Sequence, residues 1–287
     1  MIVRALTLAV AFTLASGVAA LAQGQSKAFR FTPAAPGSSH WEKVTGGRVR
    51  LVASAPAPDG EANAALEIEL EPGFRTYWRN PGKDGIPPQV QLIGSPNVRE
   101  ARMTLPPPTV FRGSSVSVGY TGSVRFPVTV RVANASAPYR LRAAGVLGFC
   151  ADVCVPVPFD LATFSPMSAT LGTASFSAPD ALVQPSEGLS LEAARFDPVT
   201  MELSVDARVP DTDVLLELVV DGVEGLELPP AASAVHQKGD RATFTFDLAQ
   251  GTVIAPDQPL DFTLIVARLG QAGRIGIEQR LPVSTVD

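Results

Sequence analysis

Hydrophobic and polar side chains alternate with a period of two residues along most of the chain. The segment ANAALEIELEPG places Leu66, Ile68 and Leu70 on one face of an extended backbone and glutamates on the other. The segments RFPVTVRV and RATFTFDL repeat this alternation. Successive residues of a β-strand point to opposite sides of a sheet, so the pattern predicts strands with one face in a core and the other in water.

Further strands are predicted where apolar segments lie between turn residues such as PAPDG, NPGKDG and QKGD. These segments are GGRVRLVAS, YRLRAAGVLGF, LSLEAARF, TMELSVDAR, VLLELVV, DFTLIVAR and GRIGIEQRL. Many short strands separated by frequent turns favour β-sandwiches of the immunoglobulin type over alternating strands and helices. The predicted fold class is therefore all-β.

The alternation stops between residues 164 and 188, where the chain reads FSPMSATLGTASFSAPDALVQPSEG. Ser, Ala, Pro and Thr dominate this segment, as is typical of a linker between domains. We predict two immunoglobulin-like β-sandwich domains in series, at residues 23–165 and 189–287, joined by a linker at residues 166–188.

The N-terminal residues MIVRALTLAVAFTLASGVAALAQ contain one basic residue, Arg4, then an apolar run and the small-residue sequence Ala20-Leu21-Ala22. This order predicts a secretory signal peptide at residues 1–22. A membrane anchor is the alternative, but Thr, Ser and Gly interrupt the run, which is shorter than the roughly 20 residues of a spanning helix. We therefore expect export to an oxidising compartment, where disulfides form, and a mature protein that is not inserted in the membrane.

The charge of the chain excludes one large class of partners. Lys and Arg total 23 against 28 Asp and Glu, for a formal net charge of -5. A surface that binds nucleic acid needs clustered Lys and Arg, so we expect no nucleic acid partner. The abundance of Pro (26) and Gly (24) agrees with a β-rich chain with many turns.

Most catalytic and metal-binding patterns are missing from the sequence. The two histidines, His40 and His236, are far apart, so a histidine-rich zinc site is not expected. No serine lies in a G-x-S-x-G turn, and no glycine loop suited to phosphate is present. We interpret the glutamates of ANAALEIELEPG as a solvated strand face, and we expect no cofactor. The cysteines remain as the one group with clear chemical content.

Both cysteines lie in the segment GVLGFCADVCVPVPFD, as Cys150 and Cys154. If Phe149 ends one strand and Val155 begins the next, the cysteines face each other across a three-residue hairpin loop. Their Cβ atoms are then about 4.5 to 5.5 Å apart, which permits a disulfide. A loop this short gives a stabilisation of only about 2 kcal/mol. Local and exposed disulfides of this kind exchange readily, so the pair is predicted to be redox-active.

Two alternatives remain open for the same cysteines. Cu(I) prefers thiolate ligands, and C-x3-C followed closely by proline resembles copper chaperones of the Sco type, although those have a thioredoxin fold and a further histidine ligand. The other alternative is a β-sandwich adaptor with a structural disulfide.

The sequence around the pair supplies no cation that would stabilise a thiolate. No Lys, Arg or His occurs from Ala143 to Asp160, and Asp152 lies between the two cysteines. We therefore predict that neither thiol has a strongly lowered pKa. The oxidised pair is then expected to receive electrons from a more acidic thiolate of a partner.

Three blocks of the chain, FRTYWRNPGKDGIPPQV, GYTGSVRFPV and GFCADVCVP, resemble the periplasmic N-terminal domain of the thiol-disulfide interchange protein DsbD, in the form found in ScsB-like and stand-alone relatives. The resemblance implies an immunoglobulin-like redox domain within a protein-disulfide reductase system. It implies a thioredoxin-like domain or membrane thiol reductase as electron donor, and oxidised periplasmic proteins as acceptors.

The resemblance also implies roles for individual residues. Cys154 matches the cysteine that forms mixed disulfides with partners, and Cys150 matches the one that resolves them. A loop caps the pair in the family, and its nearest match, FRGSSVSVGY, makes Phe111 and Tyr120 candidate shields, with core packing as the alternative. The C-x3-C spacing is shorter than in the best-known DsbD, which leaves the identity of the attacking cysteine open. Trp78 and Arg79 also belong to the family pattern. We expect them to have a role in a turn and in packing rather than in catalysis.

Overall fold

The computed structural model describes residues 37–167, 181–209, 214–223, 225–268 and 273–286. Every regular element in these residues is a β-strand, so the predicted all-β class is confirmed. The strands form three sheets around two hydrophobic cores. Contacts join the described residues into one unit. The predicted signal peptide lies outside the described residues.

The first sheet has the strand order β1-β2-β3-β9-β6, with every neighbouring pair antiparallel. Its strands are β1 (Glu42–Val44), β2 (Gly47–Ala53), β3 (Glu61–Leu70), β6 (Val98–Met103) and β9 (Ser123–Val132). Leu66, Ile68 and Leu70 of β3 are buried, as their alternation predicts. Phe126 and Val128 of β9 are buried beside them.

The second sheet has the order β11-β10-β4-β8-β7, and β5 also pairs with β10. Its strands are β4 (Arg75–Tyr77), β5 (Gln89–Gly94), β7 (Thr109–Arg112), β8 (Val116–Thr121), β10 (Arg140–Cys150) and β11 (Cys154–Phe164). Strand β10 pairs with β5 over Leu141 to Val146 and with β4 at its last residue. This arrangement brings β4, which is distant in sequence, beside the cysteines.

These two sheets enclose the first core. Its largest side chains are Trp78, Phe126, Tyr139 and Phe149, each less than 2% exposed. Burial of side chains of this size stabilises the fold by roughly 1.5 to 3 kcal/mol apiece. Antiparallel sheets that bury one face each form a β-sandwich, as predicted.

Glu67 departs from the predicted solvated face of β3. The residue is only 7% exposed, and Arg50 and Arg125, from the strands on either side, pair with its two carboxylate oxygens. The Trp41 ring stacks on the Arg50 guanidinium at 4.5 Å and covers part of this group. Alternation predicts the face to which a residue points, but not the neighbours that cover it.

We expect Glu67→Ala to lower the free energy of unfolding by about 2 kcal/mol, because two guanidinium groups lose a buried counter-charge while they keep part of their own hydration. Urea unfolding measures the change. Glu71→Ala is the matched control, because Glu71 is exposed and directly follows the same strand; its effect should stay within about 0.5 kcal/mol. Equal unfolding midpoints for wild type and Glu67→Ala would contradict a stabilising role for the ion pairs of Glu67.

The third sheet has the order β15-β18-β19-β13-β14-β17-β16, and β12 also pairs with β19. Its strands are β12 (Ala181–Leu182), β13 (Ser190–Asp197), β14 (Glu202–Arg208), β15 (Val214–Val220), β16 (Ala234–Lys238), β17 (Arg241–Asp247), β18 (Gln258–Arg268) and β19 (Arg274–Thr285). Strand β19 runs parallel to β13 and β12. Ala242, Phe244 and Phe246 are buried in the second core, as predicted. The short strand β12 lies within the predicted linker.

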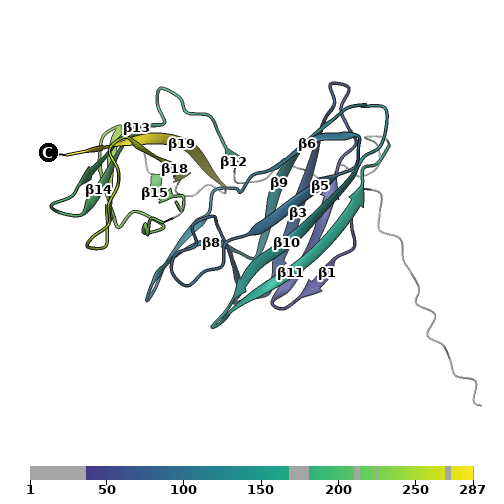
Figure 1. Cartoon of the computed structure of the whole chain (residues 1–287), viewed down its shortest axis with the longest axis horizontal. Helices are drawn as coiled ribbons and strands as arrows, with labels where there is room; N and C mark the ends of the chain where they lie inside the picture. Colours follow the sequence, from purple (N-terminus) through teal and green to yellow (C-terminus); the bar gives the residue numbers. More distant parts are fainter. Residues whose placement is uncertain (1–36, 168–180, 210–213, 224, 269–272, 287) are drawn as a thin grey trace, which may run out of the picture. The chain divides into compact units, whose positions relative to one another are not determined.

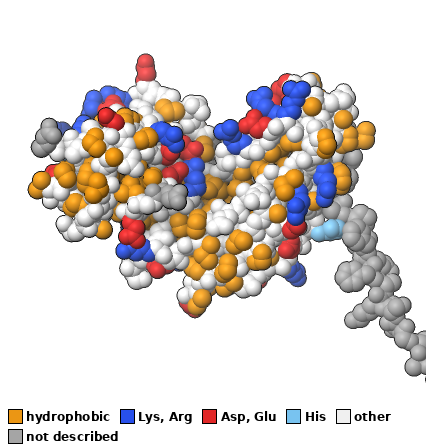
Figure 2. Space-filling model, in the orientation of Figure 1, with side chains coloured by type: hydrophobic (Ala, Val, Ile, Leu, Met, Phe, Trp, Pro, Cys, Tyr) orange, Lys and Arg blue, Asp and Glu red, His pale blue; other side chains and the backbone are white. Residues whose placement is uncertain are grey.

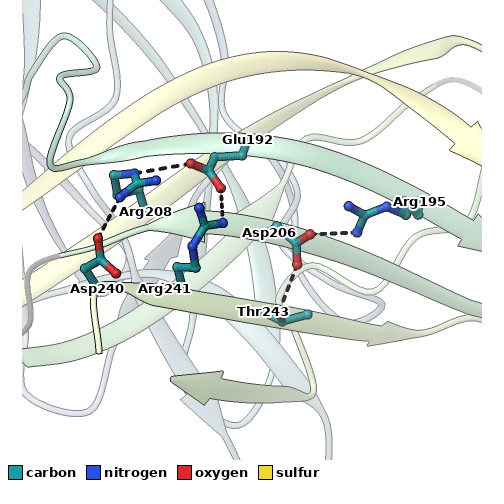
Figure 3. Close-up of polar contacts among 7 residues, drawn as sticks. All are labelled: Glu192, Arg195, Asp206, Arg208, Asp240, Arg241 and Thr243. Carbon is teal, nitrogen blue, oxygen red and sulfur yellow. Dashed lines mark hydrogen bonds and ion pairs between the residues drawn. The ribbon is translucent and has the colours of Figure 1, made fainter. Parts of the chain in front are cut away.

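Charged side chains of β13, β14 and β17, with Asp240 just before β17, form two separate groups of polar contacts (Figure 3). Arg208 and Arg241 are register partners, and like charges placed directly opposite destabilise a sheet. The Glu192 carboxylate pairs with both, at 3.3 and 3.0 Å. Burial alone would raise the pKa of Asp206, but hydrogen bonds, first that from Arg195, hold this pKa below its ordinary value. These two groups of contacts thus balance charge within the sheet.

Positive and negative side chains also lie side by side on the face of the molecule drawn in Figure 2. Within the described residues, no helix has the length and apolar character needed to cross a membrane.

Candidate redox site

The two cysteines lie at the end of a long hairpin. Strands β10 and β11 pair without interruption from Arg140↔Phe164 to Cys150↔Cys154 (Figure 1). Cys150 and Cys154 form a disulfide with an S–S distance of 2.01 Å and a Cα–Cα distance of 4.1 Å. The predicted hairpin, with its three-residue loop, is therefore confirmed.

The two sulfur-bearing residues differ in their exposure to solvent. Cys150 is only 2% exposed, whereas Cys154 is partly exposed. The loop between them is open, and Val153 at its end is 72% exposed. A thiolate of another protein can therefore approach Cys154 more readily than Cys150.

Tyr77 and Asp84 contact the sulfur of Cys154. The Tyr77 hydroxyl lies 3.4 Å from Sγ, and the Asp84 carbonyl oxygen lies 2.9 Å from it. Burial raises the pKa of Tyr77; Arg75 opposes this rise and Asp84 adds to it. The phenol therefore keeps its proton at neutral pH and can donate it to sulfur. A disulfide sulfur carries no proton, but a reduced Cys154 can donate its S–H to the Asp84 carbonyl.

Arg75 brings a positive charge to the face of the sheet that carries the cysteines. It is the register partner of Cys150, and opposed residues of antiparallel strands project from the same face. Its guanidinium stacks on the Phe111 ring at 4.8 Å and donates to Ser117 Oγ at 3.3 Å. A cation close to a thiol favours its thiolate, and Arg75 is a cation that the residues next to the cysteines in sequence do not supply. That neither thiol has a strongly lowered pKa stays a prediction.

Residues 79–86 form a loop that lies against the cysteine end of β10; we call it the covering loop. Besides the Asp84 carbonyl, the loop places Ile86 against Gly148, where an added Cβ would lie 2.6 Å from the Ile86 oxygen. Ser115 Oγ donates to the Asp84 carboxylate at 2.6 Å and ties the loop to the start of β8. The close approach at Gly148 leaves room for no larger side chain there.

Residues 48–166 match the family model for the N-terminal part of the thiol:disulfide interchange protein DsbD. Over these residues the chain is similar to the DsbD N-terminal family. The match includes both cysteines, β4 and the covering loop, so the whole site lies inside the matched residues. No curated protein matches the chain.

One solved structure supports the fold. The N-terminal periplasmic domain of ScsB from Proteus mirabilis aligns with a TM-score of 0.64 at 19% identity, over 86% of this chain and 99% of that one. The I9-I11 tandem of titin aligns over 91% of this chain and 86% of that one at 7% identity, with a TM-score of only 0.18, and carries no weight. The ScsB likeness spans both cores and shows that the two proteins share a fold.

The two predicted shielding residues lie in different surroundings. Phe111, in β7, is partly buried, and its ring contacts the guanidinium of Arg75. Tyr120 is 4% exposed; its hydroxyl donates to the Pro106 carbonyl at 2.7 Å, and its ring packs on Phe126 at 5.3 Å. These contacts of Tyr120 fit the core-packing alternative, while a shielding role for either residue stays a prediction.

Trp78 and Arg79 lie where the packing interpretation places them. Trp78 is fully buried in the first core, and the Arg79 guanidinium stacks on its ring at 4.5 Å. His40 and His236 are both exposed, one before β1 and the other in β16. In the part of the chain that the structure describes, no group of three or more His, Cys, Asp and Glu could hold a metal.

Proposed function

We propose that the chain is a periplasmic thiol-disulfide interchange protein that relays reducing equivalents through Cys150 and Cys154. The observation that carries the proposal is the unequal exposure of the two cysteines. An exchanging pair needs one sulfur within reach of a partner and a second held beside it to resolve the adduct. Similarity to the DsbD N-terminal family supports this chemistry. Partners are a thioredoxin-like domain or membrane thiol reductase as donor and oxidised periplasmic proteins as acceptors.

Reduction of the pair proceeds by two exchanges. A donor thiolate attacks Sγ of Cys154, so that a donor–Cys154 disulfide forms, the Cys150–Cys154 bond breaks and the electron pair leaves on Cys150. The second donor thiol then attacks the donor sulfur of this adduct, which releases oxidised donor and Cys154 thiolate. Two electrons and two protons reach the pair. The reduced Cys154 attacks an acceptor disulfide, and Cys150 resolves that adduct in turn.

The reduction potential of the disulfide tests the proposal against a purely structural bridge. We expect a potential more positive than about -300 mV, because stable structural disulfides lie below this value and exchanging ones above it. The mature protein is equilibrated in glutathione or dithiothreitol buffers, and the free thiols are trapped and counted. A potential clearly below this limit would contradict the proposed relay and would favour the alternative, a β-sandwich adaptor with a structural disulfide.

A further inference from the structure

The covering loop contacts the residues that follow the predicted linker. Asn80, at 9% exposed, donates through Nδ2 to the carbonyl oxygen of Val220, the last residue of β15, at 3.1 Å. Its other side-chain atom, Oδ1, accepts from the Gly82 amide at 3.4 Å. One buried amide therefore shapes the turn of the loop and fastens it to the third sheet.

Gly82 lies in the same narrow space. Its φ of +85° is a conformation that suits glycine, and an added Cβ would lie 2.5 Å from the Val116 oxygen and 3.3 Å from Pro230 Cγ. The loop is thus enclosed by β8 on one side and by residues before β16 on the other.

Arg79, at the start of the loop, adds charged contacts to the third sheet. Its Nε lies 3.2 Å from the Asp221 carboxylate, and its terminal nitrogen pairs with Glu278 of β19. Burial raises the pKa of Asp221 to about 6, and Arg79 opposes this rise. The carboxylate is therefore withdrawn from water where it meets the loop.

A second segment beside the site is held in the same way. Arg112, at the end of β7, makes a bidentate pair with Glu217 of β15 at 3.0 and 2.9 Å. Arg274 of β19 donates to Thr109 Oγ1 at 2.7 Å. Val219 of β15 belongs to the first core rather than the second. Apolar, amide and charged contacts thus all join the third sheet to segments that surround the cysteines.

We propose that the described part of residues 189–286 is a brace that holds the covering loop closed beside Cys154, with Asn80 as its main positioning residue. The loop carries the Asp84 carbonyl to 2.9 Å from Cys154 Sγ, so release of its Asn80 end loosens the segment that borders the accessible sulfur. The brace sets how easily a thiolate reaches Cys154. Its biological meaning rests on the proposed function, but access to Cys154 is measurable without any partner.

Asn80→Asp tests the brace in the full mature chain. The substitution keeps the Oδ1 acceptor for the Gly82 amide but replaces the donor to Val220 by an oxygen that repels its carbonyl. We expect the second-order rate constant for attack of glutathione on the disulfide to rise about tenfold, as loss of a buried hydrogen bond shifts the loop toward its open state. The smaller thiol 2-mercaptoethanol should gain less, because a partly covered sulfur already admits it.

Asn97→Asp is the matched control. Asn97 likewise donates through Nδ2 to backbone carbonyls, at Asn134 and Ala137, and accepts from the Asn134 amide. It lies before β6, and its contacts are with the segment between β9 and β10. The same amide-to-carboxylate change should therefore lower the melting temperature without a change in the rate constant for glutathione or for 2-mercaptoethanol.

Three results would overturn the brace: an Asn80→Asp rate constant within twofold of wild type, an equal gain in Asn97→Asp, or equal gains for both thiols in Asn80→Asp. The first would show that the loop does not limit access, and the other two that the gain reflects general loss of stability. A low reduction potential would instead reject the relay while leaving these rate constants interpretable, so the two proposals fail separately.

Discussion

The Cys150→Ser variant is expected to accumulate mixed disulfides through Cys154 in its own periplasm. Cys154 is the partly exposed member of the pair, and without Cys150 an adduct with a partner has no internal thiol to resolve it. Non-reducing electrophoresis displays the adducts, reduction dissolves them, and mass spectrometry of the excised bands identifies the partners.

The reciprocal Cys154→Ser variant is the control for this trap. Its remaining thiol, on Cys150, is only 2% exposed, so we expect roughly tenfold fewer adducts, since thiol exchange requires access. Adducts of equal abundance in both variants would contradict the assignment of Cys154 as the attacking cysteine. Absence of adducts from both variants would contradict the relay itself.

The chemistry of the hairpin was predictable from sequence because the cysteines are close together along the chain. The alternation around GFCADVCVP, with a three-residue gap, defines a strand, a tight loop and a strand, and register then follows from the loop. Cys150 and Cys154 could be placed opposite each other without knowledge of any other strand. The same locality allowed Leu66, Ile68 and Leu70 to be assigned to the core.

The surroundings of the pair depend on strand order, which alternation does not determine. Arg75 and Tyr77 are two residues apart in a family block and predictably share a strand face, yet only the pairing of β4 with Cys150 makes them part of the site. Asp84 acts through its backbone carbonyl, so its residue type gave no signal. The burial of Glu67 likewise depends on strand order, because arginines from the two strands that flank β3 pair with its carboxylate.

Strand β5 approaches β10 most closely at one glycine of β10, and Gly145→Ala is expected to have the largest effect on stability. A Cβ at Gly145 would lie 1.8 Å from the carbonyl oxygen of Gln89, the first residue of β5 and part of the backbone that pairs with β10. Backbone cannot rotate aside as a side chain can, so β5 must separate from β10. We expect the free energy of unfolding to fall by about 3 kcal/mol, as measured by urea unfolding.

Strand β5 begins shortly after the covering loop ends. Separation of β5 from β10 should therefore also expose Cys154 and raise the rate of attack by glutathione. Gly113→Ala is the control, since the nearest atom to an added Cβ there, the Ser115 oxygen, is 3.9 Å away; its effect should stay within about 0.5 kcal/mol. A wild-type unfolding midpoint for Gly145→Ala would show that β5 is not packed against β10 as described. Lost stability without faster glutathione attack would instead mean that the covering loop keeps its place independently of β5, held by its contacts with the third sheet and with Ser115.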